Sequence, residues 1–139
     1  MYLLDTNVVS ELRKASTGGA DRRVLAWTRS VPNECMYLSA VCIQELEIGI
    51  LLMERRDPRQ GAPLRSWLTD QVLPIFGSRI LVVDSAVAMK SAALHVPNPM
   101  PYRDALIAAT ALVHGMTVVT RNVHDFESTG VRILNPWQD

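Results

Sequence analysis

The sequence of 139 residues predicts an α/β protein with three layers, in which a central parallel β-sheet lies between two layers of helices. Short apolar runs alternate along the chain with longer helical segments, and this order is typical of parallel strands joined by right-handed helical crossovers. Apolar residues make up 48% of the chain and charged residues 20%, as in a globular protein with a packed core. The length suffices for one domain and is short for two, so we expect a single domain over residues 1–139.

The N-terminal segment YLLDTN predicts a buried strand that ends at a carboxylate. Three apolar residues lead directly into Asp5, which the turn-forming residues Thr6 and Asn7 follow. In parallel sheets, ligands bind outside the carboxyl ends of the strands. We therefore expect Asp5 to lie at a functional edge of the sheet.

Capping and breaking residues define the elements in the first half of the chain. Asp5 or Thr6 can cap a helix over Val8–Lys14, and the basic residues at its end suit a helix C-terminus. The further elements that we expect here are a turn at Ser16–Gly19, a helix at Arg22–Ser30, a strand at Met36–Ala40, a long helix at Val41–Arg56 and a loop at Asp57–Pro63.

The second half of the chain continues the alternation of strands and helices. Three prolines in Val96–Pro101 predict a rigid, non-helical connection, and Gly115 is a helix stop. The expected elements are helices at Leu64–Phe76, Ser85–His95 and Tyr102–Gly115, strands at Ile80–Val83, Val118–Val119 and Val131–Leu134, and a turn or short helix at Asp125–Phe126.

Two of the expected helices place a carboxylate on their apolar side. Glu45 has apolar neighbours three and four residues away, and Asp104 shares an arc with Ile107, Ala108 and Ala111. A buried carboxylate needs a partner or a metal ion. One shared cation explains several such acids together with Asp5, and oxygen ligands of this kind suit Mg²⁺ or Mn²⁺.

Each acidic residue also has a structural explanation. Asp5 could be only a helix cap, Glu45 could pair with an arginine, and Asp104 could be an acid in the first turn of its helix, where the dipole favours it. Asp125 could cap a short helix or pair with a nearby arginine. We interpret Asp84 as a cap, because its helix carries no partner acid on the apolar side.

Bulk charge and cysteine content exclude several classes of protein. Lys and Arg together number 14, as do Asp and Glu, so the net charge is zero and a polybasic nucleic-acid binder is excluded. Cys35 and Cys42 lack zinc-ligand spacing, and we favour two buried free thiols in a reducing cytoplasm over a disulfide. The N-terminus has no signal-peptide pattern and no segment is long enough to span a membrane, so we expect a cytoplasmic protein.

Four motifs in order along the chain resemble the PIN-domain ribonucleases, and specifically the VapC-type toxins of bacterial type II toxin–antitoxin pairs. The closing NPW and the overall length resemble the FitB branch of these toxins. The motifs are LLDTNVVSEL (Leu3–Leu12), LSAVCIQEL (Leu38–Leu46), DALIAATA (Asp104–Ala111) and VVTRNVHDF (Val118–Phe126).

The resemblance implies a PIN-like fold and a metal-dependent endoribonuclease that uses Mg²⁺ or Mn²⁺. The family's three acidic positions fall on Asp5, Glu45 and Asp104, which are implied to hold the metal and to be catalytic. The fourth falls on Asn122, which carries no charge, and Asp125 one turn later could replace it. The hydroxyl positions that line the family's pocket fall on Thr6 and Thr120.

Partners also follow from the resemblance. It implies an RNA substrate, a homodimer and a VapB- or FitA-like antitoxin that blocks the acidic pocket, with DNA bound only through that antitoxin. Arg103 and Arg121 are candidate contacts to RNA.

Two alternatives remain open at this stage. One is a PIN-like binding module with weakened catalysis. The other is a phosphotransferase of the haloacid-dehalogenase type. That chemistry requires a second aspartate two residues after the first, and this chain has Asn7 at that position.

Overall fold

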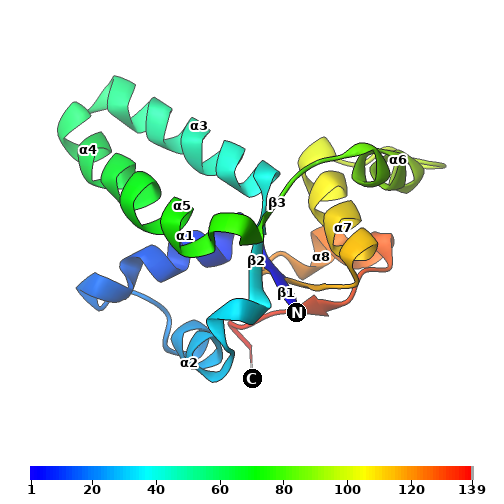
Figure 1. Ribbon diagram of the computed structural model, residues 1–139, viewed down its shortest axis with the longest axis horizontal. Coiled ribbons are helices and arrows are strands. Elements are labelled where there is room, and N and C mark those ends of the chain that lie inside the picture. Colours follow the sequence, from blue (N-terminus) through cyan, green and yellow to red (C-terminus); the bar gives the residue numbers. More distant parts are fainter. Residues whose placement is uncertain (139) are drawn as a thin grey trace.

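Five short parallel strands form one sheet at the centre of the molecule, whose computed structural model describes residues 1–138 (Figure 1). The strand order is β3-β2-β1-β4-β5, so the N-terminal strand lies in the middle. Leu3 of β1 is in register with Tyr37 on one side and with Val118 on the other. The strands are β1 (Tyr2–Leu4), β2 (Met36–Ser39), β3 (Ile80–Leu81), β4 (Thr117–Val119) and β5 (Ile133–Leu134).

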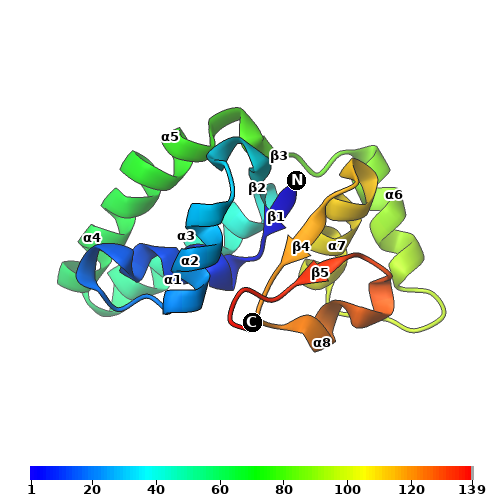
Figure 2. The same ribbon diagram turned by 90° about the horizontal axis from the view of Figure 1, so that it is seen from below.

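Helices cover both faces of this sheet, so the predicted three-layer α/β/α fold is confirmed. Figure 2 shows α1 to α5 on one side of the strands and α6 to α8 on the other. The helices are α1 (Thr6–Arg13), α2 (Arg22–Ser30), α3 (Ala40–Arg56), α4 (Pro58–Trp67), α5 (Leu73–Phe76), α6 (Ser85–Leu94), α7 (Tyr102–His114) and α8 (Val123–Phe126).

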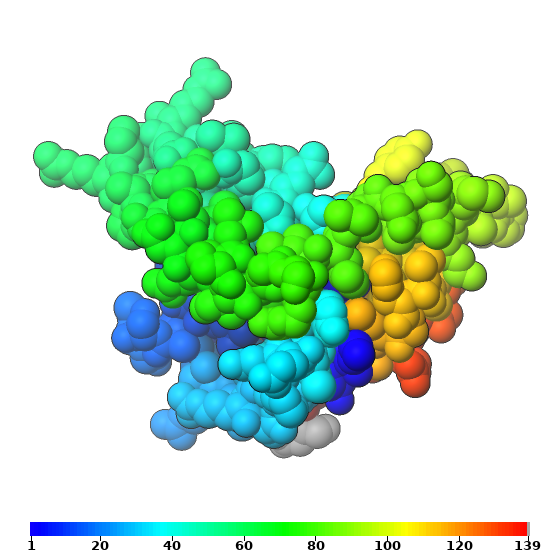
Figure 3. Space-filling model, in the orientation of Figure 1, coloured from blue at the N-terminus to red at the C-terminus, as the bar shows by residue number. Residues whose placement is uncertain are grey.

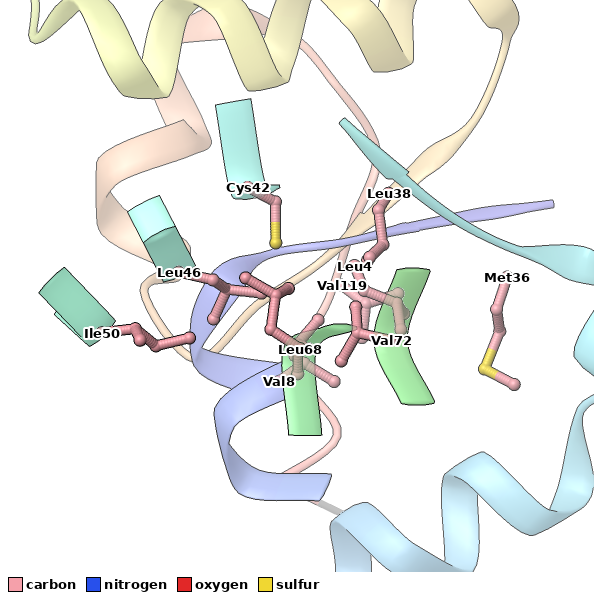
Figure 4. Close-up of a cluster of buried hydrophobic side chains, with 11 residues drawn as sticks. Leu4, Val8, Met36, Leu38, Cys42, Leu46, Ile50, Leu68, Val72 and Val119 are labelled. Carbon is pink, nitrogen blue, oxygen red and sulfur yellow. The ribbon is translucent and has the colours of Figure 1, made fainter. Parts of the chain in front are cut away.

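The central strand supplies a side chain to each of two hydrophobic cores. Leu4 packs with Val8 of α1 and with Cys42 and Leu46 of α3 (Figure 4). Leu3 points to the opposite face and belongs to the cluster formed around α7. This alternation is the two-residue period of a strand that is buried on both faces. The arrangement fixes the end of β1, and with it Asp5, in the middle of the molecule.

One element of the sequence-based prediction is wrong. Residues 57–63, expected as a loop, form the cap and most of α4. Asp57 accepts a hydrogen bond from the backbone N–H of Arg59, and Pro58 occupies the first helical position, where its missing N–H is not needed. Gly61 lies so close to α3 that a Cβ atom there would be 2.6 Å from Cγ of Glu54. The glycine therefore marks a close helix–helix contact rather than a loop.

Smaller differences concern the ends of elements. α1 begins at Thr6 rather than at Val8, because Asp5 is its cap. The expected turn after α1 is a 3₁₀ turn at Lys14–Thr17, and β3 ends two residues before Val83. The single helix expected up to Phe76 is interrupted by a π-helical turn at Leu68–Val72.

Several expectations about capping and cysteines are confirmed. Gly115 ends α7 with a positive φ of 68°, and Asp84 caps α6 by accepting a hydrogen bond from the N–H of Val87. Cys35 and Cys42 are free thiols, the former half-buried and the latter buried. None of the helices in residues 1–138 combines the length and apolar character that crossing a bilayer requires.

The antiparallel pair α3 and α4 projects from the body of the molecule. Arg65 of α4 fastens the pair through ion pairs with Glu47 at 2.5 Å and Glu54 at 2.9 Å, both on α3. The surface is hollowed between this projection and the side that carries α6 and α7 (Figure 3). The N-terminal parts of α3 and α7 face each other below this hollow, close to the end of β1.

Candidate active site

Asp5 is fixed by the sheet and by the helix that follows it. Its backbone N–H donates to the carbonyl of Val119 at 2.9 Å, which extends the pairing of β1 with β4. Its carboxylate Oδ1 accepts from the N–H of Thr6 at 2.8 Å, and Oδ2 accepts from the Thr120 hydroxyl at 2.8 Å. The residue is 0% exposed. Asp5 is thus a helix cap, as the structural explanation of this residue states, but its Oδ1 also faces the N-terminal end of α7.

Glu45 and Asp104 approach the same point from two helices. Glu45 lies in the second turn of α3, is 24% exposed and accepts a hydrogen bond from the Thr6 hydroxyl at 2.6 Å. Asp104 lies in the first turn of α7 and is 5% exposed. Segments that are distant in sequence therefore bring three carboxylates together, as the sequence predicts.

A guanidinium group lies between these carboxylates. Arg103 pairs through one terminal nitrogen with Oδ1 of Asp5 at 3.0 Å, through the other with Asp104, and through Nε with Glu45. Three negative charges and one positive charge leave the cluster with a net charge of −2 when all four groups are ionised. The alternative that Glu45 pairs with an arginine is therefore realised in this structure.

Burial and mutual charge shift the protonation equilibria in the cluster. Burial raises the pKa of Asp104, Arg103 opposes this shift, and the other acids, including Asp125, add to it. Burial opposes the charge of Arg103, but Asp5, Glu45 and Asp104 together raise the pKa of its guanidinium. The raised pKa of Asp104 therefore follows mainly from its burial, and the raised pKa of Arg103 follows from its three acidic neighbours.

The two predicted hydroxyl residues both contact the acids. Thr6 bonds to Glu45, and the fully buried Thr120 bonds to Asp5. The Thr120 hydroxyl also accepts from the side-chain amide of Asn7 at 3.3 Å, and Asn7 reaches Oδ2 of Asp5 at 3.4 Å. These contacts hold the acidic side chains in one orientation.

Sequence comparison identifies the family. A profile described as "PIN domain" matches residues 2–131. The chain belongs to the PIN-domain family. It is 38% identical to "VapC ribonuclease Y4jK" of Sinorhizobium fredii over 99% of both chains, and 37% identical to "Toxin FitB" of Neisseria gonorrhoeae over 100% of both. Its structure is similar to the solved "Structure of FitAB bound to IR36 DNA fragment", with a TM-score of 0.89, 35% identity, and coverage of 100% of this chain and 97% of that one.

The two residues predicted for a fourth acidic position, Asn122 and Asp125, are both open to solvent. Asn122 is exposed and precedes α8, and its backbone N–H donates to the Thr120 hydroxyl at 3.0 Å. Asp125 is also exposed and lies in the first turn of α8, near enough to raise the pKa of Asp104. Within residues 1–138 neither side chain hydrogen-bonds to Asp5, Glu45 or Asp104, so the choice between Asn122 and Asp125 stays a prediction.

The donor set of the PIN-domain pocket fits a hard divalent cation. Carboxylate and hydroxyl oxygens line it, and the excess negative charge calls for a cation. As the side chains stand, no three acidic, histidine or cysteine residues within the described part of the chain form a ready-made metal site. Each of the three carboxylates instead contacts a different nitrogen of the Arg103 guanidinium, which lies between them.

The two arginines expected to contact RNA occupy different environments. Arg103, placed by helical spacing on the wet face of α7, turns into the pocket and is 34% exposed. Arg121 is exposed, and its guanidinium lies 4.9 Å from the ring centre of Trp137. Sequence reasoning missed both the inward turn of Arg103 and the contribution of Asn7. The position of Arg103 directly before Asp104, an acid expected to be buried, was the signal in the sequence that could have indicated the inward turn of this arginine.

Proposed function

We propose that this PIN domain is a metal-dependent endoribonuclease and the toxin of a VapBC-type toxin–antitoxin pair. The observation that carries the proposal is the convergence of Asp5, Glu45 and Asp104 on one guanidinium from three separate segments. Relatives of nearly full coverage whose names contain "ribonuclease" and "toxin" support it.

Asp5, Asp104 and Glu45 are the residues that would hold Mg²⁺ or Mn²⁺, with Asn122 or Asp125 as a further ligand, directly or through water. When bound, such an ion polarises a phosphodiester and lowers the pKa of a water molecule. The buried position of Asp5 and Asp104 excludes bulk water from two of the ligands and strengthens their attraction for a cation.

The chain's own residues then have distinct tasks. Glu45, the most exposed of the three acids, orients a water molecule and accepts its proton at a carboxylate oxygen. The Thr6 hydroxyl, bonded to Oε1, fixes which Glu45 oxygen faces the substrate. The water oxygen bonds to phosphorus in line with the P–O3′ bond, which breaks. The leaving O3′ takes up a proton from solvent to become the 3′-hydroxyl, and the phosphate stays on the 5′ oxygen.

RNA binding requires cations outside the acidic cluster. Arg121 is exposed and follows Thr120, so its guanidinium can reach a phosphate beside the pocket. Arg103 becomes available to a phosphate only when it leaves the carboxylates. We assign a homodimer, a FitA- or VapB-like antitoxin and, through that antitoxin, DNA as the partners, and the cytoplasm as the place of action.

The test compares two aspartates that each cap a helix. Cleavage of a structured RNA is measured with Mg²⁺ or Mn²⁺, with and without excess chelator, for Asp5→Asn and for the control Asp84→Asn. Asn is a good cap, so both variants keep the helix start. Loss of a ligand that stabilises the transition state by several kcal/mol predicts a decrease of about 10³-fold for Asp5→Asn only.

The proposal is wrong if Asp5→Asn cleaves at the wild-type rate or if cleavage persists in chelator. A protein that neither binds the metal nor cleaves RNA would instead support the binding-module alternative, in which the metal has been lost. The match of the PIN-domain profile over residues 2–131 leaves the haloacid-dehalogenase alternative without support.

A further inference from the structure

Arg103 satisfies the charge of the acidic pocket from within the same chain. Its three guanidinium nitrogens each pair with a different carboxylate, of Asp5, Glu45 and Asp104. A planar guanidinium is well suited to such charge-assisted contacts. Without a cation at this point, two buried carboxylates would face a third acid with no compensating charge.

The position of Arg103 in α7 is otherwise unfavourable for a cation. It is the second residue of the helix, where the positive end of the helix dipole repels a positive charge. No helix-stabilising role explains an arginine there, whereas the three carboxylates do. The side chain is nevertheless 34% exposed, and its neighbour Tyr102 is 79% exposed. The guanidinium therefore lies at the solvent boundary of the pocket and is not enclosed by it.

The guanidinium and a divalent ion exclude each other. Arg103 already occupies Oδ1 of Asp5 at 3.0 Å and lies between that oxygen and the carboxylates of Glu45 and Asp104. An ion that binds these carboxylates must take the same space and would repel the guanidinium. The described residues accordingly contain no ready-made metal site while Arg103 is in place.

We propose that Arg103 is an internal competitor of the catalytic metal: it stabilises the metal-free pocket and must leave before a divalent ion can bind. This inference rests on the proposed function in that it takes the acidic pocket as the metal site. It adds a control step, because the fraction of protein ready for catalysis then depends on the concentration of divalent ion.

The test asks whether Arg103→Met binds the metal more tightly while its metal-free form becomes less stable. Without the competitor, the Kd for Mn²⁺ measured by calorimetry in the absence of RNA should fall roughly tenfold or more, the worth of a charge-assisted hydrogen bond. In chelator, the same variant should unfold at a lower urea concentration than wild type. Arg132→Met is the control and should change neither quantity. That arginine is exposed, and within residues 1–138 its side chain hydrogen-bonds only to the carbonyl of Gly115.

A second measurement uses wild-type protein, so it does not depend on the folding of a variant. The Nε–H signal of Arg103, assigned by its loss in Arg103→Lys, should exchange slowly with water in chelator, because it is bonded to Glu45. Addition of Mg²⁺ should move this signal to the position of a solvated arginine.

The outcomes separate the two proposals. If wild type binds Mn²⁺ and Arg103→Met binds it no more tightly, the competition is refuted and the proposed function stands. An Nε–H signal that Mg²⁺ leaves unchanged refutes it equally. If neither protein binds Mn²⁺, the proposed function itself fails and the competition with it.

Discussion

The substitution Thr120→Val tests how firmly the protein positions Asp5. Thr120 is fully buried, and its hydroxyl donates to Oδ2 of Asp5 at 2.8 Å while accepting from the N–H of Asn122 at 3.0 Å. Valine keeps the shape of the side chain and removes only the hydroxyl. Asn122 is exposed, so its N–H can turn to water, and the Asn7 amide, which also donates to the hydroxyl, keeps its contact with Oδ2 of Asp5 at 3.4 Å. The buried carboxylate oxygen loses the shorter of its two side-chain donors.

The magnitude follows from these contacts. A hydrogen bond to a charged group contributes about 1.5–3 kcal/mol, and a buried acceptor left without its donor costs a similar amount. We expect the free energy of unfolding in chelator to fall by about 2 kcal/mol. With a urea dependence of about 2 kcal/mol per molar, the unfolding midpoint should fall by about 1 M.

The matched control is Thr110→Val in α7. Thr110 is also fully buried, but its hydroxyl donates at 2.7 Å to the carbonyl of Leu106 in its own helix. That carbonyl is neutral and also belongs to the backbone ladder, so the loss should stay below about 1 kcal/mol. Equal decreases in the two variants would refute the view that Thr120 matters because it holds the charge of Asp5.

Three further predictions concern the rest of the molecule. Gly61→Ala should lower the free energy of unfolding by roughly 1–3 kcal/mol, because the new Cβ would be 2.8 Å from Cα of Glu54. Helix propensity alone predicts that alanine is more stable than glycine here. A higher melting temperature in thermal denaturation of the variant would therefore contradict the close contact between α3 and α4. Burial raises the pKa of the Cys42 thiol to about 12, so iodoacetamide at about pH 8 should label this cysteine only after the protein unfolds. If mass spectrometry finds Cys42 labelled in the native protein, the thiol does not lie in the core. Arg65 lowers the pKa of Glu54 through a hydrogen bond, so the stability that this pair contributes is present above the ordinary pKa of 4.5 and is lost as the pH falls through the lowered value. The free energies of unfolding of wild type and Glu54→Gln, measured in urea, should therefore differ less in acid than at neutral pH. A difference that does not change with pH would show that the pairing of Glu54 with Arg65 does not stabilise the protein.

The order of the elements could be predicted because apolar runs and caps are local signals. β1, α2 and α7 begin and end within a residue or two of the sequence-based expectation, and Asp84 caps α6 as expected. α4 could not be predicted in the same way. Asp57 and Pro58 form a local helix start, but Gly61 and Pro63 inside the segment are typical of a loop, and the close contact of Gly61 with α3 is a tertiary feature that the sequence does not display.

The acidic residues of the site were predictable and the arginine was not. Asp5, Glu45 and Asp104 have the apolar neighbours of buried groups, which the sequence displays directly. Helical spacing predicts on which face of α7 the Cα–Cβ bond of Arg103 points, which is the solvent-facing side. It does not predict where the guanidinium at the end of a long flexible side chain lies. The charge of three distant carboxylates decides that, and the sequence does not state that they meet.

Crystals grown with Mn²⁺ offer the most direct test of the central claim that the three carboxylates share one divalent ion. The anomalous difference map should show a peak bound by Asp5, Asp104 and Glu45, with the guanidinium of Arg103 displaced from its present contacts. A map at saturating Mn²⁺ with no peak there, and with Arg103 still paired to all three acids, would contradict the account.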